Sequence, residues 1–141
     1  MSEALLKQRR QHPARDAALK SIQCVQNGDR EGWLSLWRPD AFIEDPVGVS
    51  PMDPEGKGHR GSEEIAAFYD NFIATGDVRF HIRESFACGM ECCNVGTITT
   101  RLADGGVGRC ELVMVYKVDD EGKLLSMRAF WEVDEMMEDF F

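Results

Sequence analysis

Long hydrophobic runs and positive charge are both scarce in this sequence. No stretch of its 141 residues approaches the roughly 18 consecutive apolar residues that a membrane-spanning helix requires. Lysine and arginine together number 16, against 25 aspartates and glutamates, and the net charge is −9. An excess of acid repels nucleic acid and anionic lipid, so we expect neither nucleic acid nor a membrane as a partner.

Cysteine is present, but without a pattern that indicates a bonded or metal-binding framework. The five cysteines form an odd set, which does not suit paired disulfides. The segment CGMECC lacks the C-x₂-C spacing of zinc sites, and Cys92 and Cys93 point to opposite faces of a strand. We therefore expect no metal site. Residues 1–20 are too charged for a signal peptide, so the expected location is the cytoplasm, with reduced thiols.

Three stretches of the sequence predict helices. The first covers residues 14–27, where small and apolar residues recur at helical spacing before an Asn-Gly stop. The second covers residues 30–37 and begins after the capping residue Asp29. The third covers residues 62–74, with Ser62 as its expected cap. Their inward faces are expected to carry the aromatic residues Trp33, Trp37, Phe68, Tyr69 and Phe72.

From residue 78 onward the hydrophobic period changes to two, which predicts strands. Glycine-containing turns separate four such runs, so we expect them to pair as hairpins. The four predicted strands are residues 78–87, 92–102, 108–118 and 123–133. A short strand at 41–45 and an extended piece at 57–60 precede them. Helices followed by a long meander indicate an α+β fold: a curved antiparallel sheet wrapped on three helices as a cone with one open end.

The segment FIEDPVG, residues 42–48, ends an apolar strand on two carboxylates. Pro46 holds the preceding residue in an extended geometry, and neighbouring strand residues alternate between faces. We therefore expect Asp45 to point into an apolar interior and Glu44 to point outward. Two interpretations remain open for Asp45: a side chain that caps the turn after Pro46, or a carboxylate placed to accept a proton.

Three segments together give the sequence a family resemblance. They are NGDREGWLSLWRPDAFIEDPVG at 27–48, GSEEIAAFYDNFI at 61–73 and GKLLSMRAFWEVDEM at 122–136. Their order and spacing resemble the ketosteroid isomerases of the nuclear-transport-factor-2-like superfamily, which fold as cone-shaped α+β barrels, and the likeness covers about residues 14–136. It implies a cofactor-free isomerase of hydrophobic, steroid-like substrates, with the acid before Pro-Val-Gly, here Asp45, as general base.

The two oxyanion-hole donors of that family are absent from this sequence. Ser21 stands at the position of the family's helix tyrosine, and Met114 stands at the position of its strand aspartic acid. One such donor is commonly worth ~10²–10³ in rate, so the resemblance implies weak activity on Δ5-3-ketosteroids.

Other residues of the expected pocket follow from position. The resemblance places Trp131 beside the base. Tyr116 faces the same way as Met114, and Tyr69 lies behind Ser21. Each tyrosine either supplies a donor to the pocket or is a buried core residue bonded to a backbone carbonyl. The predicted ligand-binding residues are Trp131, Tyr116, Met114, Ser21, Tyr69, Phe68 and Trp37.

Three functions compete for this pocket. The first is an enzyme that moves a proton next to a carbonyl, either a steroid Δ-isomerase or a polyketide-cyclase-like enzyme. The second is a non-catalytic protein that binds steroid-like or other hydrophobic small molecules. The third is an interaction module, against which the intact EDPVG motif and Trp131 argue.

The chain as a whole is read as one domain over residues 1–141, with an extension at 1–13 and a tail at 137–141. We expect a homodimer that forms through the outer face of the sheet. On the last strand, Leu124 and Phe130 are predicted to lie on that outer face.

Overall fold

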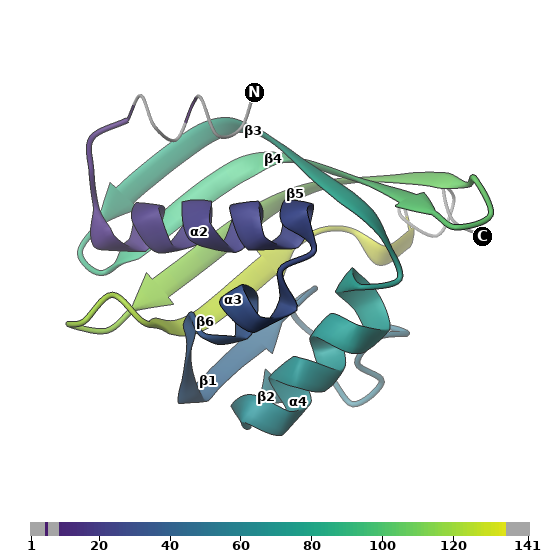
Figure 1. Cartoon of the computed structure of the whole chain (residues 1–141), viewed down its shortest axis with the longest axis horizontal. Helices are drawn as coiled ribbons and strands as arrows, with labels where there is room; N and C mark the ends of the chain where they lie inside the picture. The colour runs from purple at the N-terminus through teal and green to yellow at the C-terminus, as the bar shows by residue number, and fades with distance from the viewer. Residues whose placement is uncertain (1–4, 6–8, 135–141) are drawn as a thin grey trace.

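The computed structural model describes residue 5 and residues 9–134 (Figure 1). The predicted tail at 137–141 lies outside the described residues. None of the helices in the described part is long and apolar enough to cross a bilayer. The elements in chain order are α2 (Pro13–Asn27), α3 (Arg30–Leu34), β1 (Trp37–Glu44), β2 (His59–Arg60), α4 (Gly61–Phe68), the π-helix η1 (Tyr69–Ile73), β3 (Gly76–Cys88), β4 (Glu91–Leu102), β5 (Val107–Val118) and β6 (Leu124–Phe130).

The strands form one curved sheet in the order β2-β1-β6-β5-β4-β3. The pair β1–β6 is parallel and the other pairs are antiparallel, so the sheet is mixed rather than purely antiparallel. Helix α2 lies across β3, β4 and β5, whereas α4 packs on β1 (Figure 1). The predicted α+β fold, a curved sheet wrapped on helices, is confirmed.

Helix α2 begins and ends where its sequence predicts. Pro13 occupies the first turn, and the His12 Nδ1 atom accepts a hydrogen bond from the Ala14 N–H at 3.1 Å. Gly28 ends the helix with a φ of 67°, a left-handed conformation that favours glycine. The buried face consists mainly of small residues, which lets the helix approach the sheet closely. Its members are Ala14, Arg15, Ala17, Ala18, Ser21, Ile22 and Val25.

The second helix is shorter than predicted. Asp29 caps α3 as expected, through its Oδ1 atom and the Gly32 N–H at 2.9 Å. The helix ends at Leu34, however, and Trp37 is the first residue of β1. Pro39 cannot donate within a helix and disfavours helical geometry in the residue before it. The rings of Trp33 and Trp37 nevertheless pack together, with centroids 5.3 Å apart.

The third helix starts without the predicted serine cap. Helix α4 begins at Gly61, so Arg60 is its N-cap residue. The side chain of Arg60 accepts no hydrogen bond from the first turn of the helix. Instead the Glu64 carboxylate reaches back and accepts the Arg60 N–H at 2.9 Å, which satisfies one of the free amide groups of the first turn. The helix continues as η1, so together they cover nearly the predicted length.

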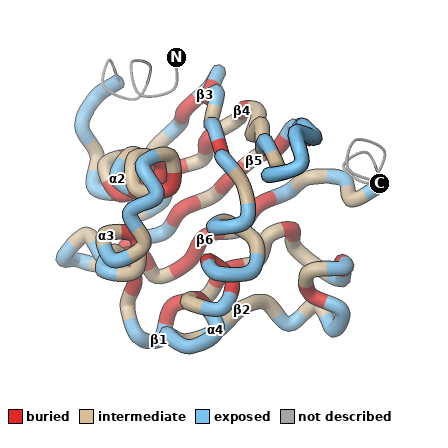
Figure 2. The backbone as a smooth tube through the Cα atoms, turned by 45° about the vertical axis from the view of Figure 1, so that its right-hand side comes forward, coloured by how far each residue is buried: buried red, intermediate tan, exposed pale blue. Residues whose placement is uncertain are grey.

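Buried residues alternate with more exposed ones along the strands, so one face of the sheet supports the core (Figure 2). A close approach of β3 and β4 occurs at Gly96, where a Cβ atom would lie 2.2 Å from the His81 carbonyl oxygen. A register shift between Ile82 and Glu84 marks the same place. Bulges and glycines of this kind bend a sheet, and here they help it to curl over the helices.

One predicted strand face is wrong. Leu124 is fully buried, although its parity with Phe130 placed it on the outer face. The register of β6 shifts between Leu124 and Ser126, and a one-residue irregularity turns every side chain beyond it to the other face. Phe130 remains 42% exposed on the outer face.

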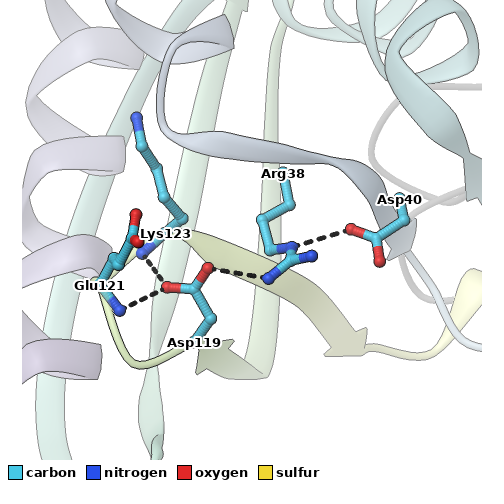
Figure 3. Close-up of polar contacts among 5 residues, drawn as sticks. All are labelled: Arg38, Asp40, Asp119, Glu121 and Lys123. Atoms are coloured by element: carbon cyan, nitrogen blue, oxygen red, sulfur yellow. Dashed lines mark hydrogen bonds and ion pairs between the residues drawn. The ribbon is translucent and has the colours of Figure 1, made fainter.

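The turn between β5 and β6 is fixed to the start of β1 by charged side chains (Figure 3). The Asp119 carboxylate accepts the backbone N–H groups of Glu121 and Lys123, at 2.8 and 2.9 Å. Its second oxygen accepts a hydrogen bond from the Arg38 guanidinium at 3.1 Å, and Arg38 also pairs with Asp40 at 2.9 Å. These contacts hold β1 and β6 in register at the end of the sheet where both begin.

Candidate active site

A cavity of about 120 Å³ lies between the sheet, α2 and the α4–η1 helix. Its wall is mostly apolar, with Ser21, Asp45, Thr100 and Tyr116 as polar exceptions beside three indole rings. The volume suits about one six-membered ring, whereas pockets for drug-sized ligands run to roughly 300–1,000 Å³. A ligand of several rings therefore leaves part of its body at the opening or displaces side chains of the wall.

Asp45 follows β1 directly and lines the cavity. Trp131, just beyond the end of β6, donates its indole Nε1–H to Asp45 Oδ1 at 2.6 Å. Burial raises the pKa of Asp45 above its ordinary value of 3.8, while the Trp131 hydrogen bond and the nearby charge of His59 act in the lowering direction. A carboxylate in this position is a better proton acceptor than an exposed aspartate.

Glu44 points away from the cavity, as the strand alternation predicts. Its Oε1 atom accepts a hydrogen bond from Arg128 Nε at 2.7 Å, across the parallel β1–β6 pair. The two neighbouring carboxylates therefore occupy different environments: Asp45 lies among apolar side chains, and Glu44 has a cationic partner.

The structure brings six of the seven predicted ligand-binding residues to the cavity wall. These are Trp131, Tyr116, Met114, Ser21, Phe68 and Trp37. Tyr69 is not among the lining residues. It is buried behind Trp33, with ring centroids 5.2 Å apart, because the large indole occupies the space in front of it.

Trp33 is a cavity residue that the sequence did not single out as part of the site. It is 2% exposed, lines the cavity, and donates its Nε1–H to Ser21 Oγ at 3.1 Å. A small residue at position 21 leaves room for this indole. The sequence does show a small residue on α2, Ser21, and a large one on α3, Trp33. It does not show that these two residues are in contact, because that depends on how the two helices pack.

Tyr116 is buried, and its hydroxyl has an unusual partner. The Tyr116 Oη atom donates to Met114 Sδ at 3.7 Å. Burial and the charge of Asp45 raise the pKa of Tyr116, and hydrogen bonding from Ser21 opposes them. The phenol therefore stays protonated at neutral pH and remains a donor.

His59 is a second residue near the site that the predicted ligand-binding set did not include. It lies on the edge strand β2 opposite Ile43, so its ring points to the inner face, where it packs on Phe68 with centroids 4.8 Å apart. Its Nε2 atom is buried without a hydrogen-bond partner within the described residues. Its charge acts on Asp45, as noted above. Among the described residues, no three His, Cys, Asp or Glu side chains are grouped to hold a metal ion.

A model of a known family, the SnoaL-like domain, matches residues 18–127 of the chain. The chain belongs to the SnoaL-like family. A solved Δ5-3-ketosteroid isomerase from Mycobacterium sp. is 36% identical, with a TM-score of 0.84, and the match covers 88% of this chain and 96% of that one. A curated relative, the steroid Δ-isomerase of Nocardioides simplex, is 28% identical over 121 residues, which are 86% of this chain and 91% of the relative.

A further solved relative of this SnoaL-like chain was crystallised with a steroid. RV0760c from Mycobacterium tuberculosis, in complex with estradiol-17β-hemisuccinate, is 35% identical with a TM-score of 0.84. The match covers 89% of this chain and 98% of that one. The predicted membership among ketosteroid isomerase-like proteins of the nuclear-transport-factor-2-like superfamily is confirmed.

Proposed function

We propose that this SnoaL-like protein binds a hydrophobic, steroid-like carbonyl compound and that Asp45 transfers a proton within it. The proton leaves the carbon next to the carbonyl and returns further along the conjugated system, which shifts a C=C bond. The observation that supports this most strongly is a single carboxylate, raised in pKa by burial, in an apolar cavity beside Trp131. The relatives named for steroid isomerisation support the same substrate class.

The charge in the cavity gives the mechanism its physical basis. Before proton transfer the negative charge is on Asp45, and afterwards it is on the oxygen of the ligand enolate. An apolar site accommodates one charge far better than two, so the transfer leaves the number of buried charges unchanged. Returning the proton to a different carbon regenerates the Asp45 carboxylate and releases the isomer.

The same site also supports a slower enzyme or a binding protein. Ser21 is engaged by Trp33, and Met114 has no donor, so two strong hydrogen bonds to the enolate are missing. We therefore propose weak turnover of Δ5-3-ketosteroids. The alternatives are a non-catalytic steroid-binding protein, favoured by these missing donors, and a polyketide-cyclase-like enzyme that uses the same base.

We also propose that two copies of the chain associate through the outer face of the sheet. Phe86 on β3 and Phe130 on β6 are 61% and 42% exposed, and both would be covered by a partner that spans this face. A contact between copies should bury at least ~1,000 Å² in total. Light scattering at micromolar concentration tests this; a mass near the 15.9 kDa of one chain would contradict it.

The proposed chemistry is tested by the absorbance of the conjugated enone that forms from a Δ5-3-ketosteroid. Asp45→Asn keeps the shape of the side chain but cannot accept a proton, so we expect the rate to fall by at least ~10²-fold. Glu44→Gln is the matched control, since it neutralises the adjacent carboxylate outside the cavity and should retain the parent rate. Equal rates in the parent and Asp45→Asn would overturn Asp45 as the base.

If the parent protein shows no turnover, binding separates the remaining functions. A steroid that binds the parent with micromolar or better affinity without reacting supports the binding protein. Tighter binding in Asp45→Asn places the ligand in this cavity, because removal of a buried charge favours an apolar ligand.

A further inference from the structure

Trp33, Ser21 and Tyr116 contribute polar groups to the wall of the cavity. Trp33 Nε1 donates to Ser21 Oγ at 3.1 Å, and an indole N–H can only donate, which fixes the direction of this bond. Ser21 in turn acts on Tyr116, since its hydroxyl opposes the rise in the pKa of that phenol. All three side chains are at least 95% buried, at 2%, 5% and 2% exposure, and all three line the cavity.

The hydroxyl group of Tyr116 has a weak hydrogen-bond acceptor. The Tyr116 hydroxyl donates its single hydrogen to Met114 Sδ at 3.7 Å. A thioether sulfur is a poor acceptor, whereas a carbonyl or phenol oxygen is a good one. Because its acceptor is this weak one, the Tyr116 hydrogen is left available for a better partner. A ligand oxygen that enters the cavity is such a partner.

The sheet register places Tyr116 and Asp45 on the same inner face, on strands separated by one other strand. Glu44 pairs with Arg128, so Asp45 falls beside Ala129, whose partner on β5 is Met114. Tyr116 lies one row further along the same inner face, opposite Met127. Two strand spacings, about 10 Å, separate β1 from β5, and Asp45 and Tyr116 both line the cavity.

We propose that Tyr116 binds the oxygen of the ligand, with Ser21 and Trp33 as positioning residues behind it. This inference rests on the proposed function for the location of the ligand, but it does not require that the ligand react. It assigns the cavity to ring compounds that carry a carbonyl or phenolic oxygen at the end facing Tyr116. It also explains why Ser21 and Met114 occur together: the serine accommodates the indole of Trp33, and the methionine leaves the Tyr116 hydroxyl without a strong competitor.

The test compares two ligands that differ by one oxygen, by calorimetric titration. The probes are estradiol and its 3-deoxy analogue, which has the same rings without the phenolic hydroxyl. Tyr116→Phe keeps the buried ring and removes the donor, so we expect estradiol to bind about five- to tenfold more weakly and the analogue to bind unchanged. An equal loss for both ligands, or no loss for either, would overturn the proposal. So would the failure of both to bind the parent protein.

The positioning residues are tested by a double-mutant cycle with the same two ligands. Ser21→Ala should weaken estradiol binding about two- to threefold in the parent and have no effect in the Tyr116→Phe background, because it acts through the tyrosine. A Ser21→Ala effect that persists without the Tyr116 hydroxyl would show a merely structural role. It would contradict Ser21 as a positioning residue for Tyr116.

Trp33 has a matched control within the same cavity. Trp33→Phe removes the indole N–H that donates to Ser21. Trp37→Phe instead replaces a neighbouring indole whose Nε1 has no partner within the described residues. We expect only Trp33→Phe to reduce the preference for estradiol over the analogue. Asp45→Asn is measured alongside: it changes turnover if the proposed function holds, but the oxygen preference must survive it. If Asp45→Asn loses turnover but the parent shows no preference for estradiol over the analogue, only the proposed function holds. If the preference is present but Asp45→Asn does not change turnover, only the role of Tyr116 holds.

Discussion

Two groups of buried polar side chains interrupt the apolar interior, and they differ in whether a cavity adjoins them. Asp45, Ser21 and Tyr116 line the cavity. The second group, here called the Arg15 cluster, consists of Arg15, Ser85, Cys92 and Asn94 and lies under the first half of α2. No member of the Arg15 cluster lines the cavity.

The Arg15 cluster makes most of its hydrogen bonds within the protein, although Asn94 Nδ2 has no partner among the described residues. Arg15 Nε donates to Ser85 Oγ at 3.0 Å, and the guanidinium also donates to the carbonyl oxygens of Ser85 and Arg10. Cys92 Sγ donates to Asn94 Oδ1 at 3.4 Å. These bonds connect α2 to β3 and β4. Both groups make hydrogen bonds within the protein, so the difference is position: the Arg15 cluster connects elements away from the cavity, while Asp45, Ser21 and Tyr116 face the space that a ligand would enter.

The largest expected effect concerns the cavity group and the rate of proton transfer. Asp45 accepts a proton only when it is ionised, so kcat/KM should fall about tenfold per pH unit below its pKa. Since burial raises that pKa above 3.8, the decline begins at a higher pH than for an exposed aspartate. A pH profile that stays flat down to 3.8 would contradict the assignment of Asp45 as base.

The second effect concerns the Arg15 cluster and the free energy of unfolding. Arg15→Met keeps much of the apolar stem but leaves Ser85 and the Arg10 carbonyl without a donor, so we expect a loss of about 2–3 kcal/mol in urea unfolding. The affinity for estradiol should not change. The control is Arg30→Met, which removes an exposed ion pair with Asp70 at 2.8 Å and should leave Tm unaltered. If Arg15→Met changed the affinity for estradiol, the Arg15 cluster would affect ligand binding as the polar residues of the cavity wall do, and the comparison would be wrong.

The third effect tests whether the space before Ser21 is filled. Restoring a tyrosine there places a large ring where Trp33 already packs, so Ser21→Tyr should cost about 1–3 kcal/mol of stability by overpacking. Lys20→Tyr, one position earlier on the exposed side of α2, is the control and should be neutral. If Ser21→Tyr folds with parent stability, Trp33 does not occupy that space in solution.

Ser21 also shows how far sequence reasoning reached. The inward face of α2, the strand runs and the position of Asp45 depend on local periodicity and on Pro46, so they were predictable. Trp33 as the partner of Ser21 was not, because it depends on the packing angle of two helices. The exclusion of Tyr69 follows from the same indole. The reversal of Leu124 depends on a one-residue irregularity in β6 that leaves no mark in the hydrophobic pattern.

The smallest effect is on thermal stability and distinguishes the charge of Asp45 from its shape. A carboxyl whose pKa is raised by folding favours the folded state below its unfolded pKa, and this contribution is lost as the pH rises through the folded pKa. At neutral pH the buried charge therefore opposes folding. Asp45→Asn should raise Tm by a few degrees, about 2–5 °C, at pH 7 and by less near pH 4. Differential scanning calorimetry at both values measures this, and a lower Tm at pH 7 would contradict it.

The parallel pairing of β1 with β6 has a consequence for how the protein is made. Asp45 and its indole partner Trp131 are separated by 86 positions, so the contact joins an early strand to the end of the last one. While the chain is being synthesised, β1 can pair with β2 early, but its parallel neighbour β6 is missing until residues 124–130 have been made. Long-range pairing of this kind is slow to form. The acid and its indole are therefore among the last groups to meet, and a nascent chain that stops before Trp131 leaves the Asp45 carboxylate without its hydrogen-bond donor.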